Sequence, residues 1–450
     1  MTRAPGRGLH RALAWRRRGW LFRAYKRLPA WLRSGVSRMA WKRLWGGLKF
    51  PALPAMAGPP MATPLARQSP SGAASLNLFG YFAGQLGLGE SARLYATALD
   101  SLGVQLAPID VDLGLLHARQ DAMTGAQPNP TREATDLVMV NPDHFGETLP
   151  MIQSLGHDRR FRVGCWHWEL ERLPPTWRQA IEHVDAIMVA SGFVEDAFSV
   201  ATNKPVFRVP LPFVLGEDSG AGRDAFGLSA TAFVFLASFD FHSSVHRKNP
   251  RDVIAAFAKA FPDTGDDVQL IVKSANGNHY PEQLAELVEA AGDDPRILVR
   301  DQSLDMRHMR ALQRCCDAYI SLHRAEGFGL GMAECMGMGK PVVATAWSGN
   351  MEYMRPDNSC LVDAELVPIA SHEYPDSVGA RWAQPDIGQA AQWMRRLVFE
   401  EGLATRIGKR AEDDIRDLLS PSRVGGLLLA GLQAARCTHD RGTTTPAVVP

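Results

Sequence analysis

Two glutamates, Glu326 and Glu334, flank a glycine-rich turn in "EGFGLGMAE". A buried strand is predicted at "DAYISL" (317–322), just before the turn, and a helix is predicted from "GMAECMGM" (331–338) onward. A strand-to-helix turn lies at the carboxyl edge of a parallel sheet, where such folds bind ligands. Its glycines let the backbone approach a ligand, and free amides at a helix start suit an anion such as phosphate. The stretch therefore predicts an anion site with a carboxylate at either end.

Two carboxylates beside a phosphate would repel it, so we expect Glu326 and Glu334 to contact neutral hydroxyl groups instead. A nucleotide sugar has a diphosphate between a sugar and a ribose, which fits this pattern. On these residues alone, a helix-capping turn with two solvated glutamates explains the stretch equally well, because Glu-x7-Glu also arises by chance.

The elements that must hold this turn belong to an alternation of strand and helix segments that is typical of a parallel, doubly wound sheet. The alternation occurs twice along the chain. Short apolar runs alternate with helical stretches from "LNLFGYFA" (76–83) to "VFRVPLPF" (206–213), and the alternation restarts at "AFVFLASF" (232–239). We therefore predict an α/β protein with two Rossmann-like domains, at residues 75–212 and 213–436, facing each other across a cleft.

Both ends of the chain are predicted to lie outside these domains. Helical segments near 386–418 and 422–436 can pack across the pair, and residues 437–450 are predicted to form a flexible tail. Residues 51–74, rich in Pro, Ala and Gly, are predicted to form a linker, so the fold is expected to begin at Leu76.

Residues 1–50 form a basic, tryptophan-rich arm. Fifteen of the chain's 49 Lys and Arg residues precede its first acid, Glu90, which leaves 34 bases against 48 acids afterwards. Arginine with tryptophan suits an anionic membrane surface, and we expect the arm to bind one. A disordered basic tail and an organellar transit peptide remain open, and nucleic-acid binding is not expected because nothing further along supports it. No stretch reaches the roughly 18 apolar residues that spanning requires.

The six cysteines show no C-x-x-C spacing, and no secretory signal precedes them. This pattern indicates a reducing compartment and argues against a zinc site or a disulfide framework. We expect neither a metal nor a cofactor.

Four segments of the chain resemble glycosyltransferases of family 4, which are retaining enzymes with the two-domain GT-B fold. The likeness covers roughly residues 76–410, and the segments fall in the family's order. They are "GYFAGQLGLGESARL" (80–94), "CWHWELERLPPTWRQAIEHVDAIMVASGFVEDAF" (165–198), "FLASFDFHSSVHRKNPRDVIAAFAKAFPD" (235–263) and "HRAEGFGLGMAECMGMGKPVVATAWSGNMEYM" (323–354). The middle two look like a subgroup common in bacterial surface-polysaccharide gene clusters.

The resemblance implies a role for each residue of the second domain's site. Glu326 matches the glutamate near the transferred sugar, and Glu334 matches the one that holds the ribose hydroxyls. Phe328, Gly329 and Leu330 would offer backbone groups to the diphosphate and sugar. Lys248 matches the lysine that neutralises the leaving diphosphate, where negative charge builds as the glycosidic bond breaks.

One family position differs in this chain. Many relatives have an arginine near the position of Ser238, and Arg247 is a candidate replacement as a donor-binding residue. Adjacent side chains need not point the same way, so we rank Lys248 above Arg247.

In the first domain, the resemblance places the loop with Gly87 and Gly89 against the donor phosphates and acceptor. We expect Glu90 and Ser91 to cap the following helix. The spacing G-x-x-G-x-G departs from the dinucleotide fingerprint G-x-G-x-x-G. His167 matches a pocket histidine that approaches the sugar, although a histidine packed among tryptophans is an equal alternative.

Together these features predict a retaining, metal-independent glycosyltransferase that uses a nucleotide-diphosphate sugar and a glycan or lipid-linked acceptor. We expect it to act in bacterial surface-glycan synthesis at the cytoplasmic face of the membrane. Two alternatives stay open: a nucleotide-sugar epimerase or phosphorylase of the same architecture, and a non-catalytic scaffold carried by the basic arm. The donor sugar, its base, the acceptor and the oligomeric state do not follow from the sequence.

Overall fold

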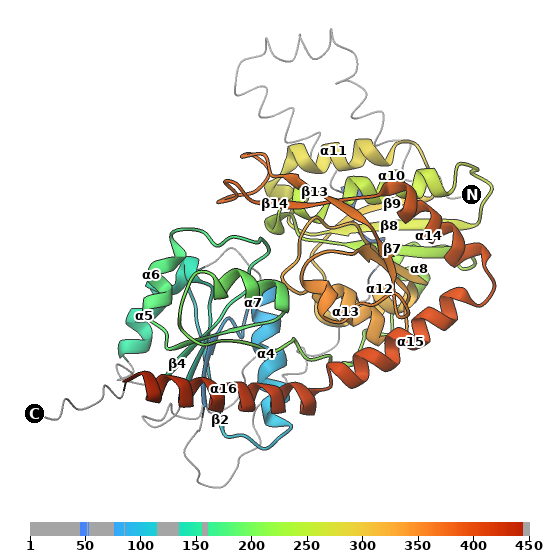
Figure 1. The fold of residues 1–450 in the computed structure, drawn as a ribbon. Coiled ribbons are helices and arrows are strands. Elements are labelled where there is room, and N and C mark those ends of the chain that lie inside the picture. The colour runs from blue at the N-terminus through green and yellow to red at the C-terminus, as the bar shows by residue number, and fades with distance from the viewer. Residues whose placement is uncertain are drawn as a thin grey trace, which may run out of the picture.

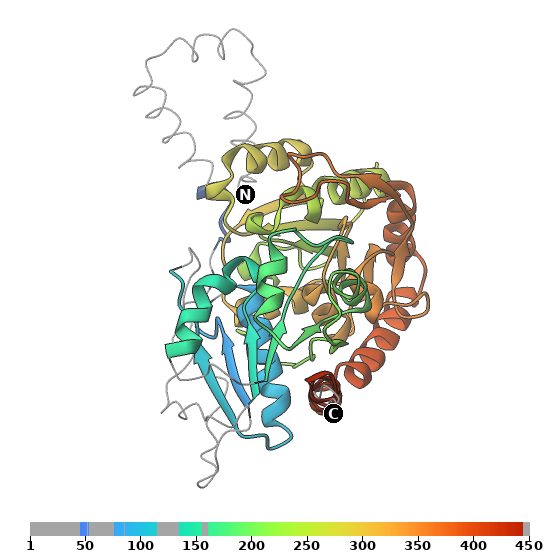
Figure 2. The ribbon, with the colours of Figure 1, turned by 60° about the vertical axis from the view of Figure 1, so that its left-hand side comes forward.

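The computed structural model describes residues 46–51, 53, 76–84, 86–114, 135–154 and 161–443. These residues form two α/β units that lie side by side (Figure 1 and Figure 2), each built on a six-stranded parallel sheet. The predicted fold class, two doubly wound Rossmann-like units, is confirmed. We refer to them as the first unit (β1–β6) and the second unit (β7–β12).

The sheet of the first unit has the strand order β2-β1-β3-β4-β5-β6. The inner strand β1, between β2 and β3, is buried along its whole length because helices cover both faces of a parallel sheet. The strands are β1 Leu76–Gly80, β2 Leu106–Asp110, β3 Thr135–Met139, β4 Arg162–Cys165, β5 Ala186–Val189 and β6 Val206–Arg208. The helices are α4 Gly87–Asp100, α5 Phe145–Ser154, α6 Trp177–Glu182 and α7 Gly192–Ser199.

The sheet of the second unit has the order β12-β11-β10-β7-β8-β9. The strands are parallel, but the sequence order runs outward in opposite directions from the neighbouring strands β7 and β10. A reversal of this kind leaves a crevice at the carboxyl ends of the two strands. The strands are β7 Phe233–Ser238, β8 Val268–Ser274, β9 Ile297–Asp301, β10 Ala318–Ser321, β11 Val342–Thr345 and β12 Cys360–Val362. An antiparallel hairpin follows, β13 Ala364–Pro368 and β14 Arg381–Pro385.

Helices cover both faces of the second sheet, and the last helix leaves it. They are α8 Arg223–Phe226, α9 Val245–Lys248, α10 Pro250–Ala260, α11 Pro281–Ala291, α12 Met306–Cys315, α13 Leu330–Gly337, α14 Ile387–Phe399, α15 Leu403–Leu418 and α16 Pro421–Thr443. Short 3₁₀ turns are η1 Pro142–His144, η2 Phe241–Ser243, η3 Gly277–His279 and η4 Gly349–Glu352.

Helix α16 returns to the first unit and packs along α4 (Figure 1). Arg436 donates a hydrogen bond to Thr135 Oγ1 at 2.9 Å, and its guanidinium lies over the ring of Phe161. The helix continues to Thr443, so residues 437–443 are helical where the sequence predicts a flexible tail.

The apolar core continues from one unit into the other. Ala325 and Trp382 of the second unit are fully buried within the same cluster as Phe79, Trp166 and Trp177 of the first. Burial of apolar side chains on both sides of a contact stabilises it. The two units therefore pack directly on each other.

The end of the N-terminal arm belongs to the second unit. Leu48 and Phe50 are 2% and 7% exposed, and the Phe50 ring contacts Phe226 edge-on. The backbone amide of Asp301, on the edge strand β9, donates to Leu48 O at 3.0 Å, and Lys49 Nζ donates to Asp301 O at 2.8 Å. The expectation that the fold begins at Leu76 is therefore wrong, because residues 48–50 cover a strand edge that would otherwise be open.

One smaller expectation about the first unit is also wrong. Helix α4 begins at Gly87 with Leu86 as its N-cap, so Glu90 and Ser91 lie in the helix, and Ser91 Oγ donates to Gly87 O at 3.0 Å. Strand β6 ends at Arg208, shortly before Pro210 and Pro212, which lack the amide that a strand needs.

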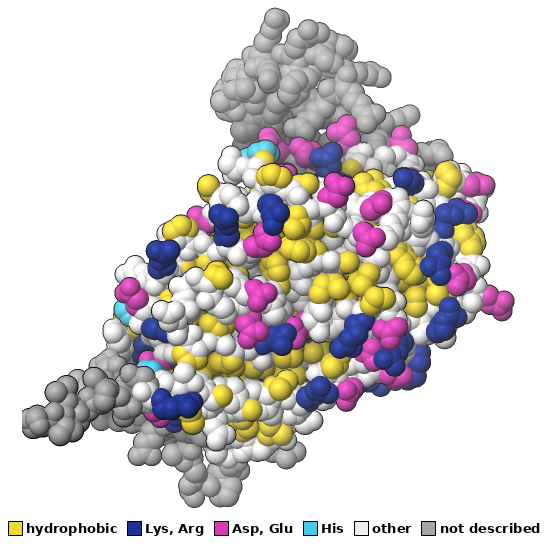
Figure 3. All heavy atoms as spheres, viewed as in Figure 1, with side chains coloured by type: hydrophobic (Ala, Val, Ile, Leu, Met, Phe, Trp, Pro, Cys, Tyr) yellow, Lys and Arg dark blue, Asp and Glu magenta, His cyan; other side chains and the backbone are white. Residues whose placement is uncertain are grey.

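The remaining predictions about the termini and the linker fall on residues 1–45, 54–75 and 444–450, outside the described residues. Among the described helices, none has the length and apolar character needed to cross a bilayer. On the face shown in Figure 3, basic and acidic side chains are interspersed over both units.

Candidate functional site

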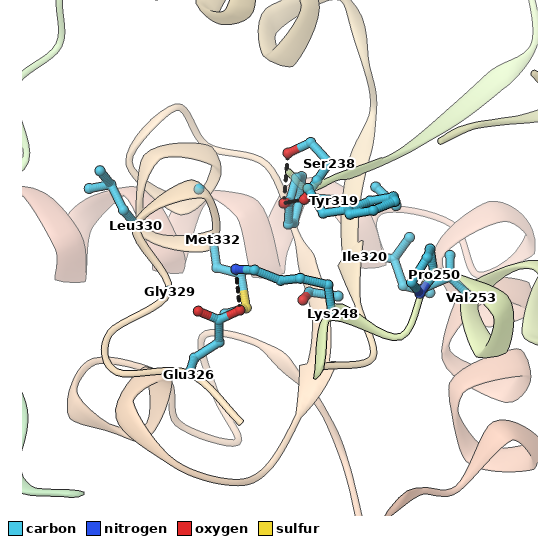
Figure 4. A pocket seen from close by; sticks show the side chains of 14 residues that line it. Ser238, Lys248, Pro250, Val253, Tyr319, Ile320, Glu326, Gly329, Leu330 and Met332 are labelled. Carbon is cyan, nitrogen blue, oxygen red and sulfur yellow. Dashed lines mark hydrogen bonds and ion pairs between the residues drawn. The ribbon is translucent and has the colours of Figure 1, made fainter. Parts of the chain in front are cut away.

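A cavity of about 120 Å³ lies at the crevice between β7 and β10 of the second unit. Ala237 and Ser238 line it from β7, Tyr319 and Ser321 line it from β10, and the start of α13 closes one side. Lys248 and Glu326 also line it, and their side chains meet head to head (Figure 4). The cavity therefore occupies the position where a doubly wound sheet binds ligands.

Glu326 is fixed by its backbone and paired through both carboxylate oxygens. Its amide donates to Ser348 Oγ at 2.8 Å, and its carbonyl accepts from the Gly349 amide at 2.8 Å. Oε1 lies 2.5 Å from Lys248 Nζ, and Oε2 lies 3.2 Å from Arg247 Nη1. Burial alone would raise the pKa of Glu326, but the two cations outweigh it and lower the pKa to about 2. The carboxylate is therefore ionised at any working pH.

The two cations come from one short helical turn, α9. Ser244 before it and Asn249 after it both have positive φ, at 62° and 51°, so the chain bends sharply at either end. Asn249 Nδ2 donates to Leu322 O at 2.9 Å, which ties the turn to the end of β10. Adjacent residues are thereby brought to opposite oxygens of one carboxylate. Burial lowers the pKa of Lys248, and Glu326 partly offsets that effect.

The glycine-rich turn borders the cavity, and two of its carbonyls are engaged by Tyr353. Tyr353 Oη donates to Gly329 O at 2.7 Å, and Phe328 O also lies within hydrogen-bonding distance of this hydroxyl, at 3.1 Å. Gly329 has φ of 84°, which a side chain would strain, and caps α13 without a side-chain hydrogen bond. Leu330 opens α13 and lines the cavity. A helix start of this kind is a ready site for an anion.

Arg247, the candidate replacement for the family arginine near Ser238, lies beside the cavity rather than among its lining residues. Ser238 lines the cavity, and its hydroxyl lies 2.9 Å from the hydroxyl of Tyr319. Arg247 is 3% exposed, is not among the residues lining the cavity, and lies 3.5 Å from Glu169 of the first unit through Nη2. Among the described residues that line the cavity, Lys248 is the one with a full positive charge.

Glu334 lies on another side of α13 from this cavity. Its Oε2 accepts from Gln313 Nε2 at 2.9 Å, and it borders a small crevice between the units together with Glu90 and Arg310. Burial raises the pKa of Glu334 to about 7, with Glu90 adding to that rise while Gln313 and Arg310 oppose it. Leu330 lines both spaces, so a ligand must pass this side chain to contact both glutamates.

The first-unit candidates are not among the residues that line the cavity. Gly87 is exposed at the start of α4, whereas Gly89 is buried against the backbone of Tyr81 and Gly84. His167 exchanges two backbone hydrogen bonds with the Asn141 side chain, at 2.9 and 3.0 Å, and no described group bonds its ring. Burial lowers the pKa of His167 to about 4, so the imidazole is neutral at neutral pH.

Within the described part of the chain, no group of three or more His, Cys, Asp or Glu residues is arranged to hold a metal ion. All six cysteines are free thiols.

Several residues of the site carry no sequence signal of their own. Ser348 and Tyr353 contact the turn from the connection between β11 and β12, 22 positions from Glu326 and 25 positions from Phe328. Glu169 contacts Arg247 from the other unit. Each lies inside a segment that carries the family resemblance, Glu169 in "CWHWELERLPP" (165–175) and the other two in 323–354. The role of Glu169 becomes visible only when the two units are placed together.

Comparison with known proteins gives one family model and several solved structures. Residues 231–371 match the model described as glycosyl transferases group 1. No curated protein matches the chain at a significant level. The matched region contains the cavity, both cations and both glutamates.

Three solved structures illustrate the likeness in fold. HepE from Anabaena, in complex with UDP-glucose, has a TM-score of 0.57 at 15% identity, over 80% of this chain and 99% of HepE. Sucrose-phosphate synthase from Thermosynechococcus elongatus has a TM-score of 0.55 at 16% identity, over 80% of this chain and 100% of that one. S. aureus TarM, as a mutant in complex with Fondaparinux, alpha-GlcNAc-glycerol and UDP, has a TM-score of 0.50 at 12% identity. That match covers 67% of this chain and only 56% of TarM.

The class that this architecture defines is the GT-B fold, with two Rossmann-like units packed on each other. The region that matches the glycosyl transferases group 1 model is its second unit.

Proposed function

We propose that the protein is a glycosyltransferase that moves a sugar from a nucleotide-diphosphate sugar to a glycan or lipid-linked acceptor, with retention of configuration. One observation carries the proposal. A single cavity at the crevice of the second sheet brings together a lysine, an ionised glutamate and the uncapped start of α13. The match to glycosyl transferases group 1 covers all three.

The diphosphate would lie at the start of α13, where backbone amides and the helix dipole favour negative charge. Lys248 reaches the same space and would leave Glu326 for the phosphate, because a diphosphate carries more charge than one carboxylate. Its contribution grows as the glycosidic bond breaks and charge accumulates on the leaving phosphate.

Glu326 would then face the transferred sugar. An ionised carboxylate accepts hydrogen bonds from sugar hydroxyls and stabilises the positive character that develops at the anomeric carbon. The low pKa of Glu326 supports this role, since the group holds no proton to donate near neutral pH. The acceptor would attack from the face that the nucleotide leaves, and the departing phosphate would take its proton. This scheme uses neither an enzyme nucleophile nor a divalent metal.

The wider setting is proposed from the sequence. The basic arm would bind an anionic membrane surface at its cytoplasmic side, which suits a lipid-linked acceptor in bacterial surface-glycan synthesis. Such an arm would be attached to the second unit, because residues 48–50 at its end pack on that unit.

A donor screen tests the proposal. Purified protein is incubated with UDP-, GDP- and dTDP-sugars, and release of the nucleoside diphosphate is measured. UDP-glucose comes first, because the HepE complex with that donor aligns along almost its whole length. Proton NMR of the new anomeric signal then reports the stereochemistry. The proposal fails if no nucleotide sugar is bound or turned over, and retention fails if an α-linked donor gives a β-linked product.

A further inference from the structure

We propose that Glu169 is a positioning residue that, acting through Arg247, holds the Glu326 carboxylate in place. The sugar-facing group of the second unit would thereby depend on contact with the first unit. The role of Glu326 in sugar transfer rests on the proposed function. The positioning of its carboxylate by Glu169 and Arg247 does not.

Arg247 joins the two carboxylates. Its Nη1 lies 3.2 Å from Glu326 Oε2 and donates to Ala325 O at 2.9 Å, while its Nη2 lies 3.5 Å from Glu169 Oε1. The arginine side chain is 4% exposed and is not among the residues that line the cavity, unlike Lys248. A buried guanidinium needs compensating negative charge, and these two carboxylates supply it from opposite units.

Glu169 is itself held in place. Its second oxygen accepts a hydrogen bond from Tyr374 Oη at 2.8 Å, and Tyr374 packs edge-on against the ring of Trp168. Tyr374 follows β13 in the second unit, so Glu169 is held by two of that unit's side chains at once. A carboxylate with both oxygens engaged has one preferred position, and it fixes the guanidinium beside it.

The first unit also covers the turn that carries Glu326. A side-chain carbon on Gly327 would lie 2.6 Å from the backbone oxygen of Trp168, so only glycine fits there. Ser191 Oγ donates to Gly327 O at 2.7 Å. Glu169 and Ser191 therefore approach the same turn from two different loops of the first unit.

In this arrangement the two cations, Lys248 and Arg247, have different roles. When Lys248 moves to a diphosphate, Arg247 remains as the cation beside Glu326. Glu169 keeps the guanidinium in its present position during that exchange, because otherwise Arg247 could follow Lys248 toward the phosphate. Separating the two units removes Glu169 and releases this constraint.

The test compares Glu169→Gln with Glu171→Gln. Glu171 makes a matched contact between the units, 3.5 Å from Arg381 Nη2, but has no link to Glu326. We expect Glu169→Gln to lower kcat about tenfold with the donor KM nearly unchanged, and Glu171→Gln to change neither. In the unliganded protein, amide exchange in residues 326–332 should be faster for Glu169→Gln and unchanged for Glu171→Gln. Tyr374→Phe should act in the same direction as Glu169→Gln, with a smaller effect.

A double variant shows whether the effect passes through Arg247. Glu169→Gln combined with Arg247→Met should be no slower than Arg247→Met alone, because interacting residues are not additive. The inference is overturned if the two losses add, or if Glu169→Gln and Glu171→Gln match each other in kcat and in exchange. The exchange measurement needs no substrate. Faster exchange in a protein that turns over no nucleotide sugar would therefore refute the proposed function and leave the positioning role standing.

Discussion

Lys248 Nζ and Glu326 Oε1 lie 2.5 Å apart and form a charge-assisted contact at the wall of the second unit's cavity (Figure 4). The side chains are 22% and 9% exposed, so water screens this ion pair only in part. Each of the two groups has a second site of interaction nearby. Glu326 also binds Arg247, and Lys248 borders the uncapped start of α13. A ligand that brings its own negative charge can therefore separate them.

Replacing Lys248 with methionine should damage turnover more than nucleotide binding. The ammonium group acts most strongly on the charge that develops as the leaving group departs, so we expect kcat to fall about 100-fold. Binding of UDP, measured by calorimetry, should change much less because the amides of α13 remain. Lys259→Met, on the exposed face of α10, is the matched control. Weaker UDP binding with an unchanged kcat would contradict the assigned role.

Replacing Glu326 with glutamine should slow transfer and leave binding of the bare nucleoside diphosphate intact. Glutamine keeps the shape and one acceptor oxygen but removes the charge. Loss of one charge-assisted contact costs about 1.5–3 kcal/mol, or roughly 10- to 100-fold in rate. Glu282→Gln on the exposed side of α11 serves as the control. A Glu326→Gln protein that transfers sugar at the normal rate would remove this residue from the mechanism.

Nucleotide affinity should depend on the protonation of Glu334 if this residue binds the ribose. Its pKa is about 7 in the unliganded protein because of burial, and hydroxyl donors would favour the ionised form and lower it. The complex would then hold fewer protons than the free protein, so affinity rises with pH, by up to about tenfold per pH unit below pH 7. Calorimetry from about pH 6 to about pH 8 measures this, and Glu334→Gln should abolish the dependence. An affinity independent of pH in the unmodified protein would argue against the ribose assignment.

The two possible truncations of the N-terminal arm should differ in stability. Deleting residues 1–45 keeps Leu48 and Phe50, whereas deleting residues 1–74 removes both from the core and uncovers the edge of β9. Loss of a buried phenylalanine alone typically costs about 3–5 kcal/mol. Urea unfolding should therefore show a clearly lower midpoint for the longer deletion, and Phe50→Ala in the full chain should reproduce part of it. Equal midpoints would mean that residues 48–50 contribute nothing to the fold.

The shorter deletion also tests the proposed membrane contact without harming the fold. Full-length protein should sediment with vesicles containing anionic lipid, and salt should weaken this binding because it screens surface charge. The protein without residues 1–45 should stay in the supernatant. If both proteins sediment equally, membrane binding does not depend on the arm.

The double α/β fold was predictable because its signals are local. Strands such as β7 are apolar on both faces, and the buried strand predicted at 317–322 is β10, Ala318–Ser321. The position of the turn around Glu326 was predictable for the same reason, since its glycines lie between a buried strand and a helix at the carboxyl edge of the sheet. The packing of residues 48–50 was not, because a few apolar residues among many bases show no periodicity.

The contacts of the charged residues could not be predicted, because they depend on distant parts of the chain. Neighbouring side chains usually diverge, and only the two positive-φ residues around α9 bring Arg247 and Lys248 to one carboxylate. The separation of Glu326 from Glu334 likewise depends on how far α13 turns between them. Glu169 requires the two units to be placed together before it has a partner at all.

The return of α16 to the first unit means that the chain passes between the two units three times: between residue 50 and β1, after β6, and between α15 and α16. These covalent connections restrict how the units can swing apart, since any rotation must use an axis that all of them tolerate. They also make the units poor candidates for separate expression. A fragment ending near residue 212 would lack α16, and the apolar surface of α4 that this helix covers would face water.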